Sequence, residues 1–317
     1  MSDPQDDLAG EGHVCPVCYI IPTFNRVDAL MICLEHLERQ TFSDFEVIVV
    51  DDGSTDSTAR QMESYSARTP LRLRYRRQSN SGPARARNLA VSMTQAPLSL
   101  MIGDDIFVCP EFTETHLQFH HERPALNVAG LGLTRWSDDR QCVTPFMRWM
   151  NESGGQFAYG DLKRGTKPGW RHFYTSNLSV KTELLRENPF NEAFTQRRWM
   201  MEDMELGYRL ERTRYLEIVF LPRALGEHLH PTDFRKACER ADKAGASLRL
   251  FDQLWPDRPA TSHGPVLRAL REILFWNSWL LRPLTLLTDI LTRFWCPNPL
   301  LRPVLAYHAA LARRRDD

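Results

Sequence analysis

Short apolar runs of strand type alternate with helix-type segments between residues 17 and 102, and this alternation limits the fold more than any other feature of the sequence. The segments between the runs carry apolar residues at helical spacing or begin with residues that cap helices. Strands that alternate with helices predict a parallel sheet covered by helices, an α/β fold. The apolar runs are VCYIIPTF, FEVIVVDD and PLSLMIGDD, and a fourth strand-type segment, LRLRYRRQ, alternates apolar and basic residues as a strand with one face in water does.

Polar pairs end three of these predicted strands. In a parallel sheet, ligands bind at the carboxyl ends of the strands. We therefore expect the three pairs to line one crevice, although long stretches of sequence separate them. The pairs are Pro22 and Thr23, Asp51 and Asp52, and Asp104 and Asp105.

Each acidic pair has a functional and a structural interpretation. A carboxylate such as Asp52 can accept hydrogen bonds from a ribose hydroxyl or a base imino group, whereas the alternative is a cap for the following helix. Asp104 and Asp105 repel each other unless a cation lies nearby. A divalent ion that bridges a diphosphate would supply that cation, and a solvated turn is the simpler alternative for an isolated pair. The convergence of the strand ends favours the functional interpretation.

Two later groups of residues could also carry chemistry. Glu202 and Asp203 begin a predicted helix, where a carboxylate could act as general base for an incoming hydroxyl. Acidic residues at a helix start are also favourable on electrostatic grounds, and both interpretations can hold together. His228 and His230 share a face if they lie on a strand. Metal binding and two surface histidines are equally compatible with their spacing.

The segment NSGPARARN turns into a predicted helix at Gly82 and Pro83. The start of that helix, or Arg85 or Arg87 within it, could face a phosphate or a base. The chain has neither a Walker A motif nor a GxGxxG motif. We therefore do not expect a P-loop enzyme or a dinucleotide-binding enzyme.

The composition excludes further classes of protein. Forty basic residues balance forty acidic ones among the 317 residues, which gives no general case for nucleic-acid binding. Seven scattered cysteines indicate reduced thiols, and we interpret the Cys15 and Cys18 pair as structural because no histidine pair follows at zinc spacing. The acidic first residues lack the features of a signal peptide, and no apolar run reaches about 18 residues. These observations predict a cytoplasmic protein.

The last part of the chain has a different character. After residue 231 the pattern is helical, and residues 265–317 hold eight arginines against four acidic residues. Trp276, Trp279 and Trp295 lie among leucines in this segment. Basic helices with aromatic residues can lie on a membrane surface. The alternative, which we slightly favour, is a helical extension packed on the rest of the chain or on a second copy.

Taken in order, these pieces resemble the inverting family 2 glycosyltransferases with the GT-A fold. The resemblance covers roughly residues 17–231. It implies a mixed, mainly parallel sheet flanked by helices, with a helical C-terminal extension. The motifs that carry it are PTFNR (22–26), VIVVDDGSTDST (47–58), NSGPARARN (80–88), GDD (103–105), TSNLSVKTELL (175–185), NEAF (191–194) and WMMEDMELGYRL (199–210).

The resemblance also implies roles for single residues. Asp203 would be the catalytic base with Glu202 beside it, and Asp105 and His228 would bind Mg²⁺ or Mn²⁺. Many relatives have a further acid where Gly103 stands, so the chain departs from the family pattern beside the implied metal ligand. The residues implied for donor binding are Pro22, Thr23, Asn25, Arg26, Asp52, Gly82, Arg87, Asp104 and Asn177.

The implied domain map has a tail (1–14), a GT-A domain (15–231) and a helical extension (232–317). Within the GT-A domain, residues 15–110 would bind the nucleotide and residues 111–231 the acceptor. The implied activity is metal-dependent transfer of a sugar, with inversion, from a nucleotide-sugar donor to a hydroxyl of a saccharide or lipid-linked glycan in cell-surface polysaccharide synthesis. The rival hypothesis is a non-catalytic nucleotide-sugar-binding or scaffold protein. Expected partners besides donor and acceptor are a second copy and, through 265–317, the inner face of a membrane.

Overall fold

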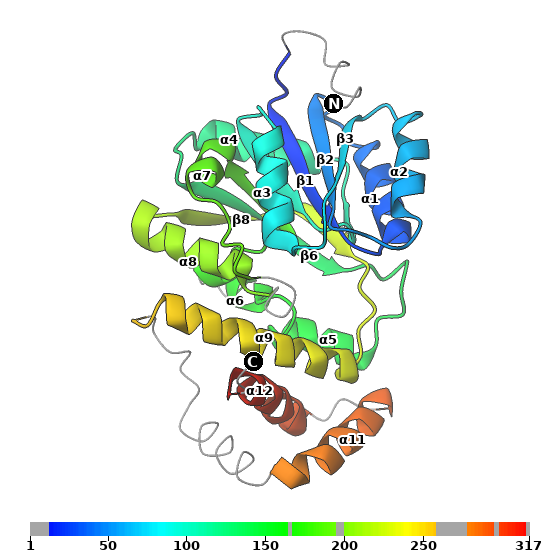
Figure 1. Cartoon of the computed structure of the whole chain (residues 1–317), viewed down its shortest axis with the longest axis vertical. Coiled ribbons are helices and arrows are strands. Elements are labelled where there is room, and N and C mark those ends of the chain that lie inside the picture. Colours follow the sequence, from blue (N-terminus) through cyan, green and yellow to red (C-terminus); the bar gives the residue numbers. More distant parts are fainter. Residues whose placement is uncertain (1–12, 164–166, 195–199, 258–277, 295–297, 315–317) are drawn as a thin grey trace.

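The computed structural model describes residues 13–163, 167–194, 200–257, 278–294 and 298–314. Its centre is one eight-stranded sheet with the strand order β3-β2-β1-β4-β7-β6-β8-β5 (Figure 1). The strands are β1 (Val17–Thr23), β2 (Phe45–Asp51), β3 (Arg72–Arg77), β4 (Leu98–Ile102), β5 (Ile106–Val108), β6 (Val128–Trp136), β7 (Asn177–Lys181) and β8 (Glu217–His228).

Helices connect and cover these strands. The ones in the first two thirds of the chain are α1 (Val27–Leu37), α2 (Thr58–Ser66), α3 (Pro83–Met93), α4 (Phe112–Glu122), α5 (Pro145–Glu152), α6 (Tyr159–Lys163), the 3₁₀ turn η1 (Trp170–His172), α7 (Thr182–Glu187) and α8 (Glu202–Arg214). The ones that follow are α9 (Phe234–Leu254), α11 (Ser278–Phe294) and α12 (Asn298–Arg314). The predicted alternation of strands and helices over residues 17–102 is therefore confirmed.

Strands β1, β2 and β4 are buried on both faces, as their continuous apolar sequences predict, whereas the edge strand β3 is exposed at alternate positions. Val17, Tyr19 and Ile21 of β1 pack in the layer that contains α1 and α2, and Cys18 and Ile20 pack in the layer that contains α3. A strand with helices on both faces has no wet side, so its two sets of alternate residues must both be apolar. The parallel pairing of β2 with β1, and of β1 with β4, brings their carboxyl ends to one edge of the sheet.

The second half of the sheet contains strands that run antiparallel to their neighbours. Strand β7 pairs antiparallel with both β4 and β6, and β5 pairs antiparallel with β8, whereas β6 and β8 are parallel. Four of the seven neighbouring pairs among the described strands are parallel, which confirms a mixed, mainly parallel sheet. The register of β6 against β8 shifts between Gly132 and Leu133. A side chain at Gly132 would meet the amide oxygen of Asn177 at 2.1 Å, so glycine is required at this close approach.

The helical C-terminal extension is also confirmed. Helix α12 packs along α9, and α11 lies beside both below the sheet domain (Figure 1). An apolar cluster joins the extension to α5, in which the rings of Phe146 and Phe234 are 5.9 Å apart. Residues 1–12 of the predicted tail, and Trp276 and Trp295 of the predicted membrane segment, lie outside the described residues.

Among the described residues, no helix is both long enough and apolar enough to cross a membrane. The described part of residues 265–317 consists of α11 and α12. On α11, the side chains of Leu286, Leu287 and Ile290 are 59%, 50% and 46% exposed. This helix therefore presents an apolar face to solvent, while its other face contributes Leu284 to the cluster with α5 and α9.

Candidate active site

Two adjacent carboxylates lie where β4 ends, and residues that follow β1 hold them. Asp104 Oδ2 accepts a hydrogen bond of 2.8 Å from the hydroxyl of Thr23. The guanidinium of Arg26 lies 3.0 Å from Asp104 Oδ1 and 2.6 Å from Asp105 Oδ2. Both carboxylates are about 95% buried, so a single cation bridges two charges that would otherwise repel each other out of water. The expected convergence of the β1 and β4 ends is therefore present.

The two acids differ in their protonation. Burial raises the pKa of Asp104 to about 6, against the opposing effect of Arg26. Burial acts in the same direction on Asp105, but His228, His230 and Arg26 hold the pKa of this carboxyl well below its usual range. Asp105 is therefore the carboxylate that stays ionised, which is the state that a metal ligand requires.

Two imidazoles converge on Asp105. His228 ends β8, and its Nε2 atom lies 3.3 Å from Asp105 Oδ2; His230 Nδ1 lies at the same distance from that oxygen. The ring of Trp136 stacks on His228 at 5.3 Å, and the two histidine rings stack at 5.1 Å. The hydrogen bond to Asp105 acts to raise the pKa of His230, but burial together with the nearby His228 and Arg26 outweighs it, so the pKa is lowered. Three potential ligand atoms thus meet within 4.8 Å of one another.

The two acids that end β2 have different surroundings. Asp51 is fully buried, and it accepts hydrogen bonds from the Ser54 amide at 2.7 Å and from the Tyr75 hydroxyl at 2.6 Å. These contacts fix the turn after the strand. At Gly53 the backbone φ is +83°, and a side chain there would meet the Asn80 nitrogen at 2.9 Å. Glycine therefore lets the segment around residue 80 approach the strand end.

Asp52 holds the start of α3. Its Oδ1 accepts hydrogen bonds from Gln78 Nε2 at 2.7 Å and from the Ser81 amide at 2.8 Å, and its Oδ2 accepts one from the Gly82 amide at 2.8 Å. Two carboxylate oxygens offer about four lone-pair sites. Three are therefore in use, and roughly one remains for a ligand hydroxyl or imino group.

The other residues implied after β1 lie beside these groups. Pro22 belongs to β1, opposite Val50 of β2. The amide oxygen of Asn25 accepts a hydrogen bond of 2.7 Å from the Thr55 backbone, and its own backbone donates to the Ser54 hydroxyl. With a positive φ of 52°, Asn25 braces the loop after β1 against the loop after β2. Its oxygen is directed at protein backbone rather than at open solvent.

Arg87 and Asn177 use part of their polar groups on protein partners, while Arg87 Nε and Asn177 Oδ1 are buried without a hydrogen-bond partner among the described residues. The guanidinium of Arg87 binds the carboxylate of Glu202 at 2.8 Å and lies 5.5 Å from the centre of the Phe190 ring. Asn177 is fully buried, and its amide donates to the carbonyls of Leu133 and Ala224 at 3.2 and 3.1 Å. Asn177 thus ties β7 to β6 and β8 beneath the site. Direct contacts of these two residues with a donor stay predictions.

Glu202 and Asp203 occupy the first turn of α8, as the sequence predicts. Met201 before them adopts the left-handed backbone conformation, which starts the helix abruptly. Desolvation and the neighbouring Glu202 carboxylate raise the pKa of Asp203 to about 7. A carboxylate with this pKa can take up a proton near neutral pH, as a general base must.

Arg240 of α9 is a residue near the site that no sequence motif singles out. Burial lowers the pKa of its guanidinium, and the nearby Asp105 carboxylate acts to raise it. Its Nη1 atom donates to the amide oxygen of Gln156 at 2.5 Å, and no carboxylate among the described residues pairs with it. An arginine within a long helical segment carries no local signal of this placement. Its position close to Asp105 emerges only when α9 packs against the sheet domain.

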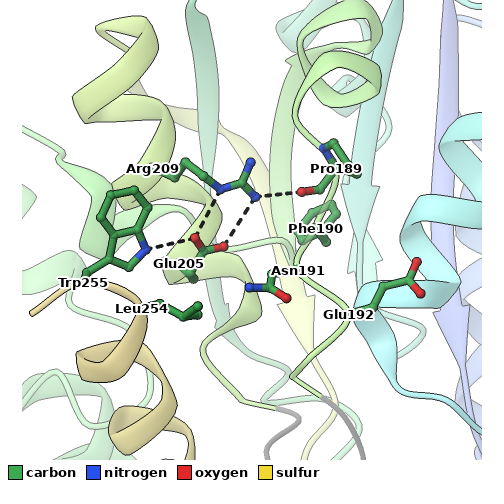
Figure 2. Close-up of a pocket in the computed structure, with 8 residues that line it drawn as sticks. All are labelled: Pro189, Phe190, Asn191, Glu192, Glu205, Arg209, Leu254 and Trp255. Atoms are coloured by element: carbon green, nitrogen blue, oxygen red, sulfur yellow. Dashed lines mark hydrogen bonds and ion pairs between the residues drawn. The ribbon is translucent and has the colours of Figure 1, made fainter.

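A separate groove lies farther along α8 (Figure 2). It has a volume of about 460 Å³, and none of the residues implied for donor, metal or base lines it. Glu205 in its wall is held by Arg209 Nε and by Trp255 Nε1, both at 3.1 Å. The lining residues are Pro189, Phe190, Asn191, Glu192, Glu205, Arg209, Leu254 and Trp255.

Solved structures with a similar fold support the architecture. The mannosyltransferase PcManGT from Pyrobaculum calidifontis aligns over 96% of this chain and 77% of its own, with a TM-score of 0.56 and 16% identity. TarS residues 1–349 from S. aureus align over 94% and 91%, with a TM-score of 0.50 and 18% identity. At these identities the similarity shows the fold alone.

Sequence relatives give the family. Validoxylamine A glucosyltransferase of Streptomyces hygroscopicus subsp. jinggangensis is 33% identical over 224 residues, which are 62% of this chain and 52% of that protein. The uncharacterized glycosyltransferase EpsJ of Bacillus subtilis is 29% identical over 231 residues, 67% of this chain and 66% of its own. The chain thus spans about half the length of the first of these relatives. The sequence profile of Glycosyl transferase family 2 matches residues 18–182, more than half of the chain, which therefore belongs to this family.

Proposed function

We propose that the chain is a metal-dependent, inverting glycosyltransferase that moves a sugar from a nucleotide-sugar donor to a hydroxyl acceptor. The observation that carries the proposal is the meeting of Asp104 and Asp105 with His228 and His230 at the sheet edge where Asp52 also lies. A buried carboxylate pair beside two imidazoles suits a divalent cation and a diphosphate. The acceptor we propose is a saccharide or lipid-linked glycan in cell-surface polysaccharide synthesis.

The donor's nucleotide would lie along the loops after β1 and β2. Asp52 has about one lone-pair site left for the ribose or base. Gly82 begins α3 with a φ of +93°, which lets the backbone approach a ligand without a side chain in between. TarS has been solved in complex with UDP, and PcManGT in complex with GDP-Man and Mn²⁺. Both bound molecules are nucleotide derivatives, the class of ligand proposed here.

The residues present fit a divalent metal ion. Asp105, His228 and His230 each offer one ligand atom. The guanidinium of Arg26 contacts the carboxylates of Asp104 and Asp105, so this place attracts positive charge. Imidazole ligands favour Mn²⁺ over Mg²⁺, which prefers oxygen. When bound, the ion would neutralise charge on the leaving diphosphate. The half-buried Arg240 could add a second positive charge there, since no described carboxylate pairs with it.

Asp203 is the proposed base for the transfer step. As the acceptor oxygen bonds to the anomeric carbon, the bond from that carbon to the diphosphate oxygen breaks and the acceptor proton passes to the Asp203 carboxylate. Attack from the face opposite the leaving group inverts the anomeric configuration. Glu202 keeps the pKa of Asp203 raised, and Arg87 holds Glu202 in place.

The test compares ligand binding with turnover in the purified chain. We expect one nucleotide sugar of a panel to raise the melting temperature, and to raise it further with Mn²⁺, because only a bound ligand stabilises the folded state. Asp203→Asn should keep this shift and lose transfer to an acceptor. The wild type could instead bind nucleotide sugars without transferring the sugar to any acceptor tested and without hydrolysing the donor. The scaffold hypothesis would then replace this proposal. Full turnover by Asp203→Asn would refute the assigned base.

We also propose contact with a membrane surface through α11. The apolar side chains of Leu286, Leu287 and Ile290 form one exposed face, and residues 265–317 carry an excess of arginine. Apolar burial combined with positive charge is how interfacial helices bind anionic lipid. A second copy of the chain is the alternative cover for this face.

A further inference from the structure

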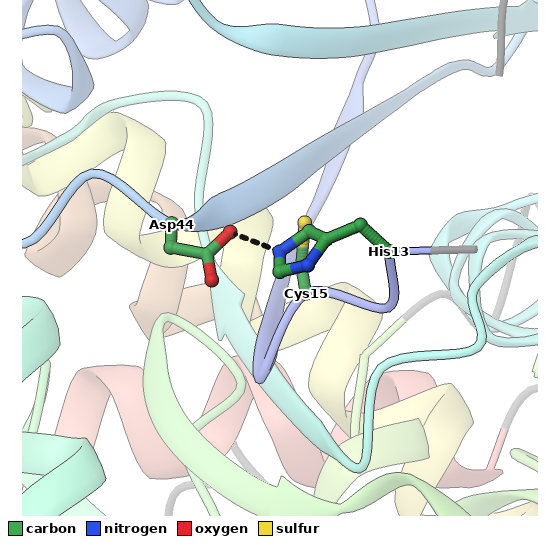
Figure 3. Close-up of side chains that lie close together, drawn as sticks. All are labelled: His13, Cys15 and Asp44. Carbon is green, nitrogen blue, oxygen red and sulfur yellow. Dashed lines mark hydrogen bonds and ion pairs between the residues drawn. The ribbon is translucent and has the colours of Figure 1, made fainter. Parts of the chain in front are cut away.

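A second group of metal-ligand side chains lies at the opposite edge of the sheet (Figure 3). His13 and Cys15 precede β1, and Asp44 directly precedes β2. One ligand atom from each of the three lies within 4.8 Å of the others. The length of β1 separates this edge from the candidate active site by roughly 20 Å. We propose that His13, Cys15 and Asp44 form a Zn²⁺ site that is independent of the glycosyltransferase chemistry.

The three side chains of this cluster are chemically suited to bind Zn²⁺. A thiolate, an imidazole and a carboxylate are the three side-chain groups that bind Zn²⁺ in proteins, and sulfur selects against Mg²⁺ and Mn²⁺. With metal–ligand distances near 2.0–2.3 Å, a tetrahedral ion holds its ligand atoms about 3.3–3.8 Å apart. His13 Nε2 and Asp44 Oδ1 now lie 2.7 Å apart, joined by a hydrogen bond. They need to separate by less than about 1 Å, which side chains that are 57% and 38% exposed can do by rotation.

A cation already occupies this cluster. Arg72 Nη1 lies 2.8 Å from Asp44 Oδ1 and 2.9 Å from Cys15 Sγ. The guanidinium and a divalent ion would use the same two ligand atoms, so they exclude each other. Arg72 lies on the edge strand β3 and its side chain is 56% exposed, so it can turn into water when an ion enters. The structure therefore predicts that Arg72 competes with the metal.

The CxxC spacing of Cys15 and Cys18 does not produce this site. Residues three apart on an extended chain point to opposite faces. Cys18 accordingly lies in the core with no exposure, whereas Cys15 lies beside Asp44 and Arg72. With His13 and Asp44 as partners, the ion would fasten the segment before β1 to the start of β2. Its role would be structural.

Co²⁺ added to the full chain provides the test. A thiolate bound to Co²⁺ gives a charge-transfer absorption in the near ultraviolet, which the oxygen and nitrogen ligands around Asp105 cannot give. We expect this band to saturate when one Co²⁺ per chain is bound to the thiolate, whatever amount the Asp105 site also takes up, and to disappear when Zn²⁺ is added. Cys15→Ser should abolish it, and His13→Ala and Asp44→Asn should each weaken Co²⁺ binding by about tenfold or more. Cys142→Ser, at an exposed cysteine, should leave it unchanged.

Arg72→Met should change Co²⁺ affinity in the opposite direction to the ligand variants. Removal of the competing cation should tighten Co²⁺ binding, while a mere loss of structure would loosen it. The proposal is overturned if the wild-type chain shows no charge-transfer band, if the band persists in Cys15→Ser, or if Arg72→Met weakens binding. Because these readouts are spectroscopic and involve no donor or acceptor, their failure leaves the proposed transferase activity untouched, and the reverse also holds.

Discussion

Arg87 Nη1 lies 2.8 Å from Glu202 Oε1, and the two side chains are only 10% and 7% exposed. The pair joins the helix after the third strand to the helix that begins with the proposed base, across 115 positions of sequence. A buried ion pair of this kind fixes geometry more reliably than it adds stability, and removal of one partner leaves a buried charge behind. The position of Asp203 therefore depends on an arginine in another part of the chain.

Arg87→Met should destabilise the fold because it leaves the Glu202 carboxylate buried without its partner. We expect the free energy of unfolding to fall by about 3 kcal/mol, measured by urea denaturation monitored by circular dichroism. Arg85→Met on the exposed face of α3 is the matched control and should change little. The double variant Arg87→Met with Glu202→Gln should recover part of the loss. A loss no larger than that of the control would show that the pair is not energetically coupled to the fold.

Glu202→Gln should shift the pH dependence of transfer. With a pKa of about 7 for Asp203, activity falls below neutral pH as the base takes up a proton, and levels off above it. The Glu202 carboxylate is one cause of that raised value, so its removal lowers the pKa of Asp203 and extends activity to lower pH. The measurement is kcat/KM for the acceptor from pH 5 to 9. If the fall in kcat/KM at low pH occurs at the same pH in the variant, a group other than Asp203 causes that fall.

His228→Ala and His230→Ala test the metal ligands separately. If both imidazoles bind the ion, each variant should weaken Mn²⁺ binding by about tenfold or more, as measured by calorimetry or by paramagnetic resonance of free Mn²⁺. Asp105→Asn should weaken it further because it removes the charged ligand. His121→Ala, at an exposed position of α4, is the control. Unchanged binding in His230→Ala would leave His228 as the single histidine ligand.

Arg240→Met tests the half-buried cation of α9. Loss of a charge-assisted contact to the diphosphate should weaken binding of a nucleoside diphosphate by about 10- to 100-fold, as expected for 1.5–3 kcal/mol. Binding of the corresponding nucleoside, which has no phosphate, should be unaffected. Arg235→Met on the exposed face of the same helix controls for general loss of charge. Equal losses for nucleoside and nucleoside diphosphate would indicate a structural role for Arg240 instead.

Serine substitution of Leu286, Leu287 and Ile290 tests the exposed face of α11. The triple variant should lose sedimentation with anionic liposomes, because transfer of each leucine-sized side chain out of water contributes about 1.5–3 kcal/mol. The wild-type chain should bind neutral liposomes less well than anionic ones. If wild type and variant partition equally, and the variant instead dissociates a dimer in gel filtration, a second copy covers this face.

The sequence alone determined the fold of residues 17–102. Strand and helix periodicities are local, so β1, α1, β2, α2, β3, α3 and β4 could be predicted from short windows. Parallel strands also place their carboxyl ends at one edge, so the meeting of Thr23 with Asp104 followed from topology. The family motifs added the expected positions of Asp203 and His228.

Only the tertiary structure decided which side chains meet across long separations. No local sequence pattern predicts four of these features. They are the antiparallel insertion of β7 between β4 and β6, the pairing of Arg87 with Glu202, the placement of the half-buried Arg240 near Asp105, and the cluster of His13, Cys15 and Asp44. Each feature depends on how separate elements pack. A solvated charged side chain costs little free energy on a helix or in a loop, and it needs a specific partner only when packing removes it from water. The sequence therefore predicted where the site lies, and packing decided which charges hold it together.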